Sequence, residues 1–184
     1  MGPQWHGCGR LALRPMAAPT IRDATLQDVR AIAQIGIDGW RVGYRGIVSD
    51  DDLAGISLDD REARWVAVLS EGRARTLVAE VDGEVAAFCS LAAPSRDEDA
   101  PPDTAEVAAL YVSPKRWRTG LGSALLDAAL AELDGTAWTA VTLWVFSANE
   151  RGRAFYAAHG FEVADEAVNE HTGLPVVRLR RRLG

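Results

Sequence analysis

The sequence predicts a mixed α/β fold, in which a central sheet of six to seven strands is flanked by about four helices. Three observations favour this fold. Short β-rich runs alternate with segments of helical periodicity along the chain. Asp82-Gly83 joins two such runs with the turn residues of a hairpin. The run "AEVAALYV" is apolar almost throughout, as a strand covered on both faces would be.

The N-terminal half is predicted to contain a short strand and two helices. The strand is "TIRDAT". Its last residue, Thr25, and Asp28 three residues later have the spacing of a capping box. Apolar residues at helical spacing predict a helix over residues 26–38. The Gly-rich stretch "GWRVGYRGIVSDDDLAG" is predicted to be irregular, and Ser57 is placed to cap the second helix.

The C-terminal half is predicted to alternate strands and helices. Apolar positions from Leu121 onward mark a helix that ends near Asp134-Gly135. The run "AVTLWVF" predicts a strand, and residues 150–159 predict a helix closed by Gly160. The runs "FEVADEAV" and "PVVRLRRRL" predict the last two strands.

Length and composition predict one domain without a membrane span. The chain has 184 residues, and residues 20–184 suffice for a single domain with a sizeable core. Residues 1–19 are rich in Gly, Pro and Arg, so we expect a disordered tail, with Met16 as an alternative start. No run approaches the roughly 18 apolar residues that a membrane helix needs.

Charge and cysteine content argue against nucleic acid and metal ions as partners. The net charge of -6 argues against a nucleic-acid surface, which needs a basic face. The two cysteines, Cys8 and Cys89, are isolated and form neither a disulfide framework nor a zinc site, so we expect a reducing cytoplasm and no metal.

One joint of the chain gathers positive charge and bare backbone. The stretch "SPKRWRTGLGSALL" lies between a strand that ends at Val112 and a helix that begins near Gly120. The first turn of a helix has N–H groups without intrahelical partners, which attract anions. Gly120 and Gly122 allow close backbone approach. The residues alone leave two readings open, an anion site or a tight turn with solvated cations.

This stretch resembles the signature Gln/Arg-x-x-Gly-x-Gly/Ala of the GNAT N-acetyltransferase superfamily, whose main-chain amides bind the pyrophosphate of acetyl-CoA. Gly120 and Gly122 match the two small positions, and Trp117 stands where Gln or Arg is usual. The run "NERGRAFYAAHGF" resembles the second signature of the family, and the element order fits from Ile21 onward. The resemblance implies the GNAT acyl-CoA N-acyltransferase fold, in which the strands "EVAALYV" and "AVTLWVF" splay apart to admit the cofactor.

The resemblance also implies a set of cofactor-binding residues. Leu110 to Val112 offer main-chain groups to the pantetheine arm, like an added strand. Asn149 is implied to hydrogen-bond the same arm, although Asn is also a favoured helix N-cap, and both roles stay open. The full set of expected acetyl-CoA contacts is Leu110, Tyr111, Val112, Arg116, Trp117, Arg118, Thr119, Gly120, Leu121, Gly122, Ser123, Asn149 and Tyr156.

Acetyl transfer to an amine requires an acid and a base. Tyr156 is the candidate acid, because a phenol is protonated at neutral pH and the residue matches the family's tyrosine near the coenzyme sulfur. The alternative is a packed helix tyrosine. Glu106, eleven residues before Trp117, is the candidate base by analogy with the histone-acetylating branch, and the alternative is a solvated strand end. Strand alternation predicts that Glu106 and Leu110 share a face.

The acceptor is less defined than the cofactor. Trp40 and Tyr44 lie in the segment that shapes the acceptor pocket in GNAT folds, as an aromatic wall around an amine or as loop packing. We expect acetyl transfer to a primary amine by direct attack in a ternary complex, with a small molecule rather than a protein as acceptor. The alternative is an acyl-CoA-binding regulatory module without acceptor chemistry. A homodimer is expected, with no nucleic-acid or membrane partner.

Overall fold

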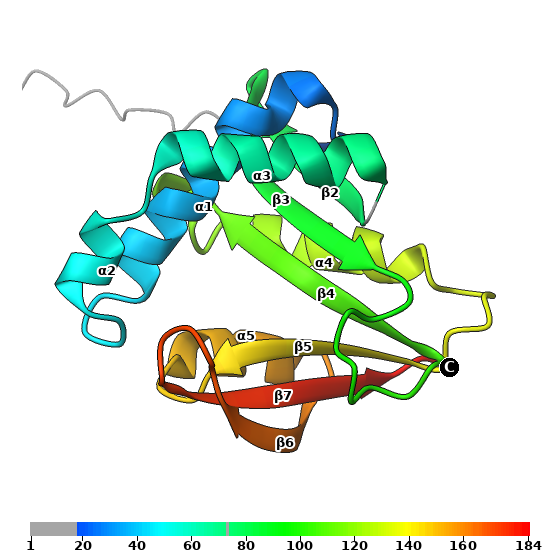
Figure 1. The fold of residues 1–184 in the computed structure, drawn as a ribbon. Helices are drawn as coiled ribbons and strands as arrows, with labels where there is room; N and C mark the ends of the chain where they lie inside the picture. Colours follow the sequence, from blue (N-terminus) through cyan, green and yellow to red (C-terminus); the bar gives the residue numbers. More distant parts are fainter. Residues whose placement is uncertain (1–17, 73) are drawn as a thin grey trace, which may run out of the picture.

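The computed structural model describes residues 18–72 and 74–184, whose strands form one sheet (Figure 1). The sheet has seven strands in the order β1-β2-β3-β4-β5-β7-β6, and only the β4–β5 pair is parallel. The strands are β1 (Thr20–Asp23), β2 (Arg75–Val81), β3 (Glu84–Ala92), β4 (Thr104–Val112), β5 (Ala140–Phe146), β6 (Glu162–Val168) and β7 (Pro175–Arg182). The prediction of a mixed sheet with six to seven strands is confirmed.

Helices cover both faces of the sheet (Figure 1). On one face lie α1 (Val29–Gly43), α2 (Asp50–Ala54) and α3 (Leu58–Glu71), and on the other lie α4 (Leu121–Ala131) and α5 (Glu150–Ala158). Short 3-10 turns, η1 (Leu26–Asp28) and η2 (Pro114–Arg116), precede α1 and α4. Of the predicted tail at 1–19, residues 1–17 lie outside the described residues.

The core is divided by the sheet. Beneath α4, Leu125 and Leu126 are fully buried in one cluster with Ala87 and Cys89 of β3. On the opposite face, Ile32 of α1 packs with Phe88 of β3 and with the partly buried Trp65 of α3. The sheet is therefore apolar on both faces, as the run "AEVAALYV" predicted.

The first long helix extends further than its sequence predicted. The glycines after residue 38 favour an irregular segment, but α1 continues to Gly43. A Cβ on Gly39 would lie 2.8 Å from Cδ1 of Tyr111, so this glycine allows α1 to approach β4 closely. Tertiary packing thus overrides low helix propensity, and it brings Trp40 and Tyr44 against Phe146 at the end of β5.

The two central strands separate as the resemblance implied. Pairing between β4 and β5 is limited to Thr104–Ala140, Ala105–Val141 and Glu106–Thr142. Beyond these pairs the strands diverge toward α1, and Figure 1 shows the wedge between them. Residues 107–112 therefore have one edge of main-chain groups with which no strand of the described chain pairs.

A bulge in β4 lies at the point where the strands separate. Ala109 pairs with Ser90 of β3, whereas Val107 pairs with the next residue, Leu91. Ala108 is therefore an extra residue in β4, and such a bulge reverses the alternation of side chains beyond it.

The bulge corrects one prediction about side-chain direction. Val107 and Leu110 both pack against the core beneath α4, although they are three residues apart. Glu106, the neighbour of Val107, therefore faces the side opposite Leu110. The prediction that Glu106 and Leu110 share a face is wrong, because it assumed an unbroken alternation.

The start of α1 is held by a buried carboxylate. Asp28 accepts the main-chain N–H of Thr25 at 2.7 Å, as the predicted capping box requires, and it also pairs with Arg22 at 2.8 Å. The hydrogen bond from Arg22 lowers the pKa of Asp28 from 3.8 to about 2. Burial of the carboxylate acts in the opposite direction, and the bonds from Thr25 lower the pKa further. Because Arg22 also binds Glu80 at 2.7 Å, the cluster joins α1 to β1 and β2.

We predict a stability difference at acid pH for Asp28→Asn. A carboxylate whose folded-state pKa is depressed stabilises the fold above its unfolded pKa, and this contribution is lost as pH falls through the folded pKa. The unaltered protein should therefore lose stability between about pH 4 and pH 2 more steeply than Asp28→Asn. Urea unfolding of both proteins across this range measures the difference, and parallel curves would contradict the assignment.

Candidate active site

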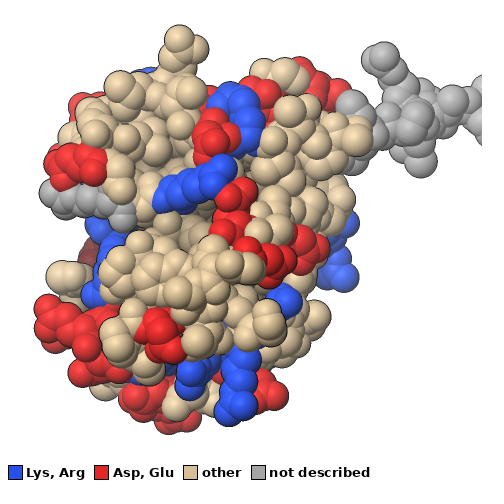
Figure 2. Space-filling model, turned by 90° about the vertical axis from the view of Figure 1, so that its right-hand side faces the viewer, with Lys and Arg blue, Asp and Glu red and all other residues tan. Residues whose placement is uncertain are grey.

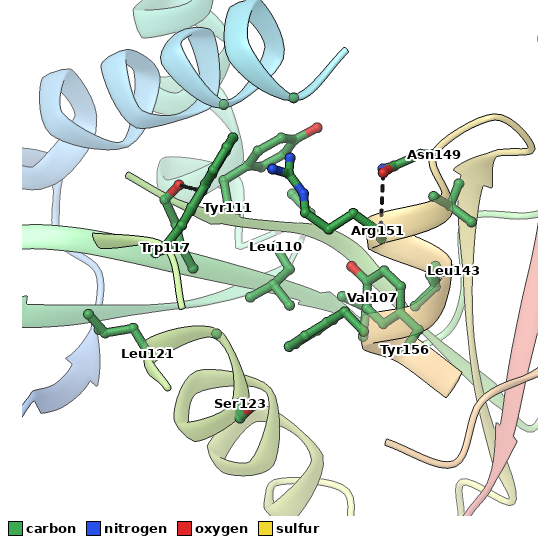
Figure 3. A pocket seen from close by; sticks show the side chains of 18 of the residues that line it. Val107, Leu110, Tyr111, Trp117, Leu121, Ser123, Leu143, Asn149, Arg151 and Tyr156 are labelled. Atoms are coloured by element: carbon green, nitrogen blue, oxygen red, sulfur yellow. Dashed lines mark hydrogen bonds between the residues drawn. The ribbon is translucent and has the colours of Figure 1, made fainter. Parts of the chain in front are cut away.

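The separated strands open a cavity of about 370 Å³ between β4, β5, α1, α4 and α5 (Figure 3). Every residue expected to bind acetyl-CoA lines it except Thr119, whose hydroxyl donates to the carbonyl of Arg116 at 2.7 Å. Tyr44 of the expected acceptor wall also lines the cavity, whereas Trp40 and Glu106 do not.

The joint between β4 and α4 forms the floor of the cavity. Arg118 and Gly120 have positive φ angles of 63° and 84°, and Gly120 is the N-cap of α4. Within the described chain, none of the main-chain N–H groups of residues 118–123 donates to an acceptor. Successive unpaired N–H groups at a helix N-terminus form a concave anion site. This geometry favours the anion reading of the joint over a simple turn.

The only polar atom of the Trp117 side chain forms a hydrogen bond with the main chain. Its indole N–H donates to the carbonyl of Val112 at 2.8 Å, so it anchors the loop to the end of β4. The guanidinium of Arg151, from α5, lies 3.9 Å from the centre of the indole ring. The side chains of Trp117 and Arg151 therefore meet across the cavity between α4 and α5 (Figure 3).

Asn149 caps α5 at the edge of the cavity. Its Oδ1 accepts the N–H of Gly152 at 2.9 Å (dashed in Figure 3), which confirms the predicted helix N-cap. A Cβ on Gly152 would lie 2.5 Å from Nδ2 of Asn149, so only glycine at this position allows the amide to fold over the helix. The cap uses Oδ1, and Nδ2 has no described acceptor.

Tyr156 points its hydroxyl into the cavity from α5 (Figure 3). Its ring packs edge-on against Phe155 and Phe161, at centroid distances of 5.1 Å and 5.6 Å. Burial, with smaller contributions from the nearby Cys89 and Tyr44, raises the pKa of the Tyr156 phenol well above its usual value. The group is therefore a protonated donor throughout the physiological pH range.

An aromatic cluster closes the α1 end of the cavity. Tyr44 packs edge-on against Trp40 and Phe146, at centroid distances of 4.8 Å and 5.1 Å. The indole N–H of Trp40 donates to the hydroxyl of Tyr111 at 2.8 Å. Trp40 therefore supports the wall from behind, while Tyr44 faces the cavity.

The structure does not bring Glu106 to the cavity. Glu106 is buried, and both of its carboxylate oxygens are held by Arg96, at 2.7 Å from Nη2 and 3.1 Å from Nε. The main-chain N–H of Arg96 adds a third bond at 3.0 Å. This ion pair ties the β3–β4 loop to the sheet.

The charged side chains that line the described cavity are all arginines: Arg116, Arg118 and Arg151. No Asp, Glu or His of the described chain lines it. The cavity therefore favours anions and the neutral form of an amine.

Several lining residues were not predicted. The separated strands contribute Val107, Ala108, Ala109, Leu143, Trp144 and Val145, and the helices contribute Gly39, Gly43, Arg151, Gly152 and Phe155. The α5 members lie within "NERGRAFYAAHGF", so that motif held the signal for them. Gly39 and Gly43 carried no such signal, because their part of α1 was predicted to be irregular.

The outer surface is mixed in charge. On the face in Figure 2, Lys and Arg side chains are interspersed with Asp and Glu, so the described residues form no continuous basic surface there. Among the helices that the structure describes, none has the length and apolarity to cross a bilayer.

Comparison with known proteins supports this picture. Residues 40–161 match the model of the Acetyltransferase (GNAT) family. The chain is 31% identical over 156 residues to the uncharacterised N-acetyltransferase YuaI of Bacillus subtilis strain 168, covering 84% of this chain and 87% of YuaI.

Solved structures agree with the fold. PaiA N-acetyltransferase of Thermoplasma acidophilum, in complex with coenzyme A, superposes with a TM-score of 0.72 at 20% identity, covering 91% of this chain and all of PaiA (100%). YncA of Salmonella typhimurium, a putative acetyltransferase with its cofactor acetyl-CoA, gives 0.68 at 25% identity, covering 91% and 95% of the two chains.

A parallel strand pair that separates beside a helix N-terminus with unpaired main-chain N–H groups, together with these relatives, defines the protein as an acetyltransferase. The chain belongs to the GNAT family.

Proposed function

We propose that this protein transfers an acetyl group from acetyl-CoA to the primary amine of a small molecule, by direct attack in a ternary complex. The observation that carries the proposal is one continuous cavity. It joins the unpaired N–H groups of residues 118–123, the open edge of β4 and the hydroxyl of Tyr156. Anion site, strand edge and acid follow one another in the order of diphosphate, pantetheine and thioester.

Main-chain groups of the cavity support the use of acetyl-CoA. The N–H groups of 118–123 lack described acceptors, which the phosphate oxygens would supply. No described strand pairs with the edge of residues 110–112 that faces β5, and the amides of pantetheine would add to it as a strand does. The carbonyl of Val112 is the exception, because it accepts the indole N–H of Trp117.

Tyr156 is proposed to donate its proton to the departing coenzyme A thiolate. Its phenol lies in the cavity, and its raised pKa keeps it protonated, so that it hydrogen-bonds the thiolate as the thioester bond breaks. The proton that the amine releases to water restores the phenol after the transfer. The amine loses its proton to water in this proposal, because the described lining contains no carboxylate or imidazole. A role of Glu106 as base stays a prediction, and Arg96 restricts its access to a route through water.

The size of the acceptor follows from the α1 end of the cavity. Tyr44, Trp144 and the α1 glycines enclose this end, and the aromatic cluster of Trp40 and Phe146 lies behind it. Such a wall suits a small amine better than an extended peptide. A homodimer and a cytoplasmic location remain predictions.

Calorimetric titration with acetyl-CoA, followed by an amine panel with thiol-release detection, tests the proposal. Micromolar acetyl-CoA binding with at least one amine that releases thiol is expected. If the protein binds acetyl-CoA but no amine releases thiol, an acyl-CoA-binding module without acceptor chemistry would be favoured. The lack of a carboxylate in the described cavity lining supports this alternative. Absence of binding would contradict both.

Asn149 variants are predicted to separate two roles of one side chain. Asn149→Asp keeps the oxygen that caps α5 but loses the Nδ2 donor, so stability should be retained and acetyl-CoA affinity should fall several-fold. Asn149→Ala should lose both, with about 1 kcal/mol of stability. Thermal unfolding and titration of the two variants provide the measurement, and equal affinity of Asn149→Asp and the unaltered protein would exclude the pantetheine contact.

A further inference from the structure

Arg151 is a cation of the cavity without an acidic partner in the described chain. It projects from the first turn of α5 and is exposed to the cavity, and no carboxylate of residues 18–72 or 74–184 forms an ion pair with it. Its Nη2 lies 3.3 Å from the position that a Cβ would take on Gly43, so the side chain reaches across to α1. This reach places its charge at the mouth of the cavity, where the side chain stays exposed.

The position of Arg151 is set by Trp117. The guanidinium lies 3.9 Å from the centre of the indole ring, and the indole is itself fixed by the bond from its N–H to Val112 at 2.8 Å. A guanidinium that stacks on an aromatic face keeps its N–H edge free for oxygen ligands. Trp117 therefore orients a cation that another element supplies.

The phosphate loop brings two arginines to the cavity, Arg116 and Arg118, and only Arg116 has an acidic partner in the described chain. Arg116 is paired with Asp82 of the β2–β3 turn at 3.2 Å. Trp117 occupies the position at which the related signature has Gln or Arg, and its polar atom is already bonded. The residue after it, Arg118, begins the row of unpaired N–H groups. Arg151 thus lies against the residue that adjoins the anion site.

We propose that Arg151, held on the indole face of Trp117, is a cation that binds the diphosphate of the cofactor in place of the side chain missing at residue 117. The inference rests on the proposed use of acetyl-CoA. Its guanidinium matches two phosphate oxygens at once, and the stacked geometry reduces the entropy lost on binding. The diphosphate is thus clamped between the main-chain N–H groups of α4 and a side chain of α5.

Titration with two thioesters tests the assignment. One is acetyl-CoA, and the other is S-acetylpantetheine, which carries the same thioester arm without phosphates. Arg151→Ala is expected to weaken acetyl-CoA binding about tenfold or more, because it removes a charge-assisted pair, and to leave S-acetylpantetheine binding unchanged. Arg64→Ala, which removes an exposed arginine of α3 outside the cavity, controls for net charge.

Each other outcome counts against the inference. Equal losses for both thioesters would mean that Arg151 shapes the pantetheine channel. Unchanged affinity for both thioesters would mean that Arg151 does not contact the cofactor. A raised KM for the amine with unchanged acetyl-CoA affinity would assign Arg151 to an acidic group of the acceptor. If the unaltered protein fails to bind acetyl-CoA, the proposed function itself fails, which is a different result.

A double-mutant comparison tests the role of Trp117. If the indole positions Arg151, then Trp117→Leu should weaken acetyl-CoA binding and should have little further effect in the Arg151→Ala background. Strictly additive losses would overturn the coupling. Unchanged thermal unfolding midpoints for the single variants show that the fold is retained.

Discussion

Replacing Tyr156 by Phe is expected to lower kcat about 100-fold or more, while the affinity for acetyl-CoA stays nearly unchanged. The substitution removes one oxygen from the cavity, and Phe keeps the ring contacts with Phe155 and Phe161. The loss should therefore fall on the step in which the coenzyme A thiolate departs. Steady-state kinetics with calorimetric titration of the same variant separate the two quantities.

The pH profile sharpens this prediction. Because burial raises the pKa of Tyr156, the phenol stays protonated, and kcat should show no alkaline decline from this group up to about pH 10. A decline that disappears in Tyr156→Phe would mean that the phenol titrates at its ordinary value. Unchanged kcat in Tyr156→Phe would exclude its role as the acid.

Replacing Gly120 by Glu is expected to abolish acetyl-CoA binding, with a loss of 100-fold or more. Gly120 has a φ angle of 84° and no heavy atom within 4 Å of an ideal Cβ, so a side chain would project into the open anion site. The carboxylate would then repel the phosphates and occupy their place beside the N–H groups of α4. Titration with acetyl-CoA measures the effect.

Gly135→Glu is the matched control for this variant. Gly135 also has a positive φ angle, 70°, and also has no heavy atom within 4 Å of an ideal Cβ, but it lies in the turn after α4. Both variants pay a similar backbone strain and add the same charge. Comparable losses of affinity in the two would show that strain or net charge, rather than the anion site, is responsible.

Local features of this protein could be predicted because neighbouring residues determine them. The Asp82-Gly83 turn, with φ angles of 55° and 81°, needs only residues that tolerate the left-handed region. The cap at Ser57 accepts the N–H of Asp60 at 3.2 Å, a bond within one turn of chain. The unpaired main-chain N–H groups at Gly120 likewise follow from a strand, a glycine and a helix in succession.

Features that depend on pairing between distant strands were harder to predict from the sequence. The side-chain direction of Glu106 depends on a bulge at Ala108, and the bulge is defined by the register against β3. No local pattern in "EVAALYV" reveals it. The separation of β4 from β5 was expected only through family resemblance, since strand pairing is a property of two segments at once.

The sequence by itself determined the class of fold, the cationic joint with its two glycines and the two signatures, because each depends on contiguous residues. The tertiary structure alone decided which side chains share the cavity. It extended α1 through Gly39 against Tyr111, engaged Glu106 with Arg96, and stacked Arg151 on Trp117. The physical reason is that burial, charge pairing and stacking join segments far apart in the chain, and their geometry exists only once the sheet has formed.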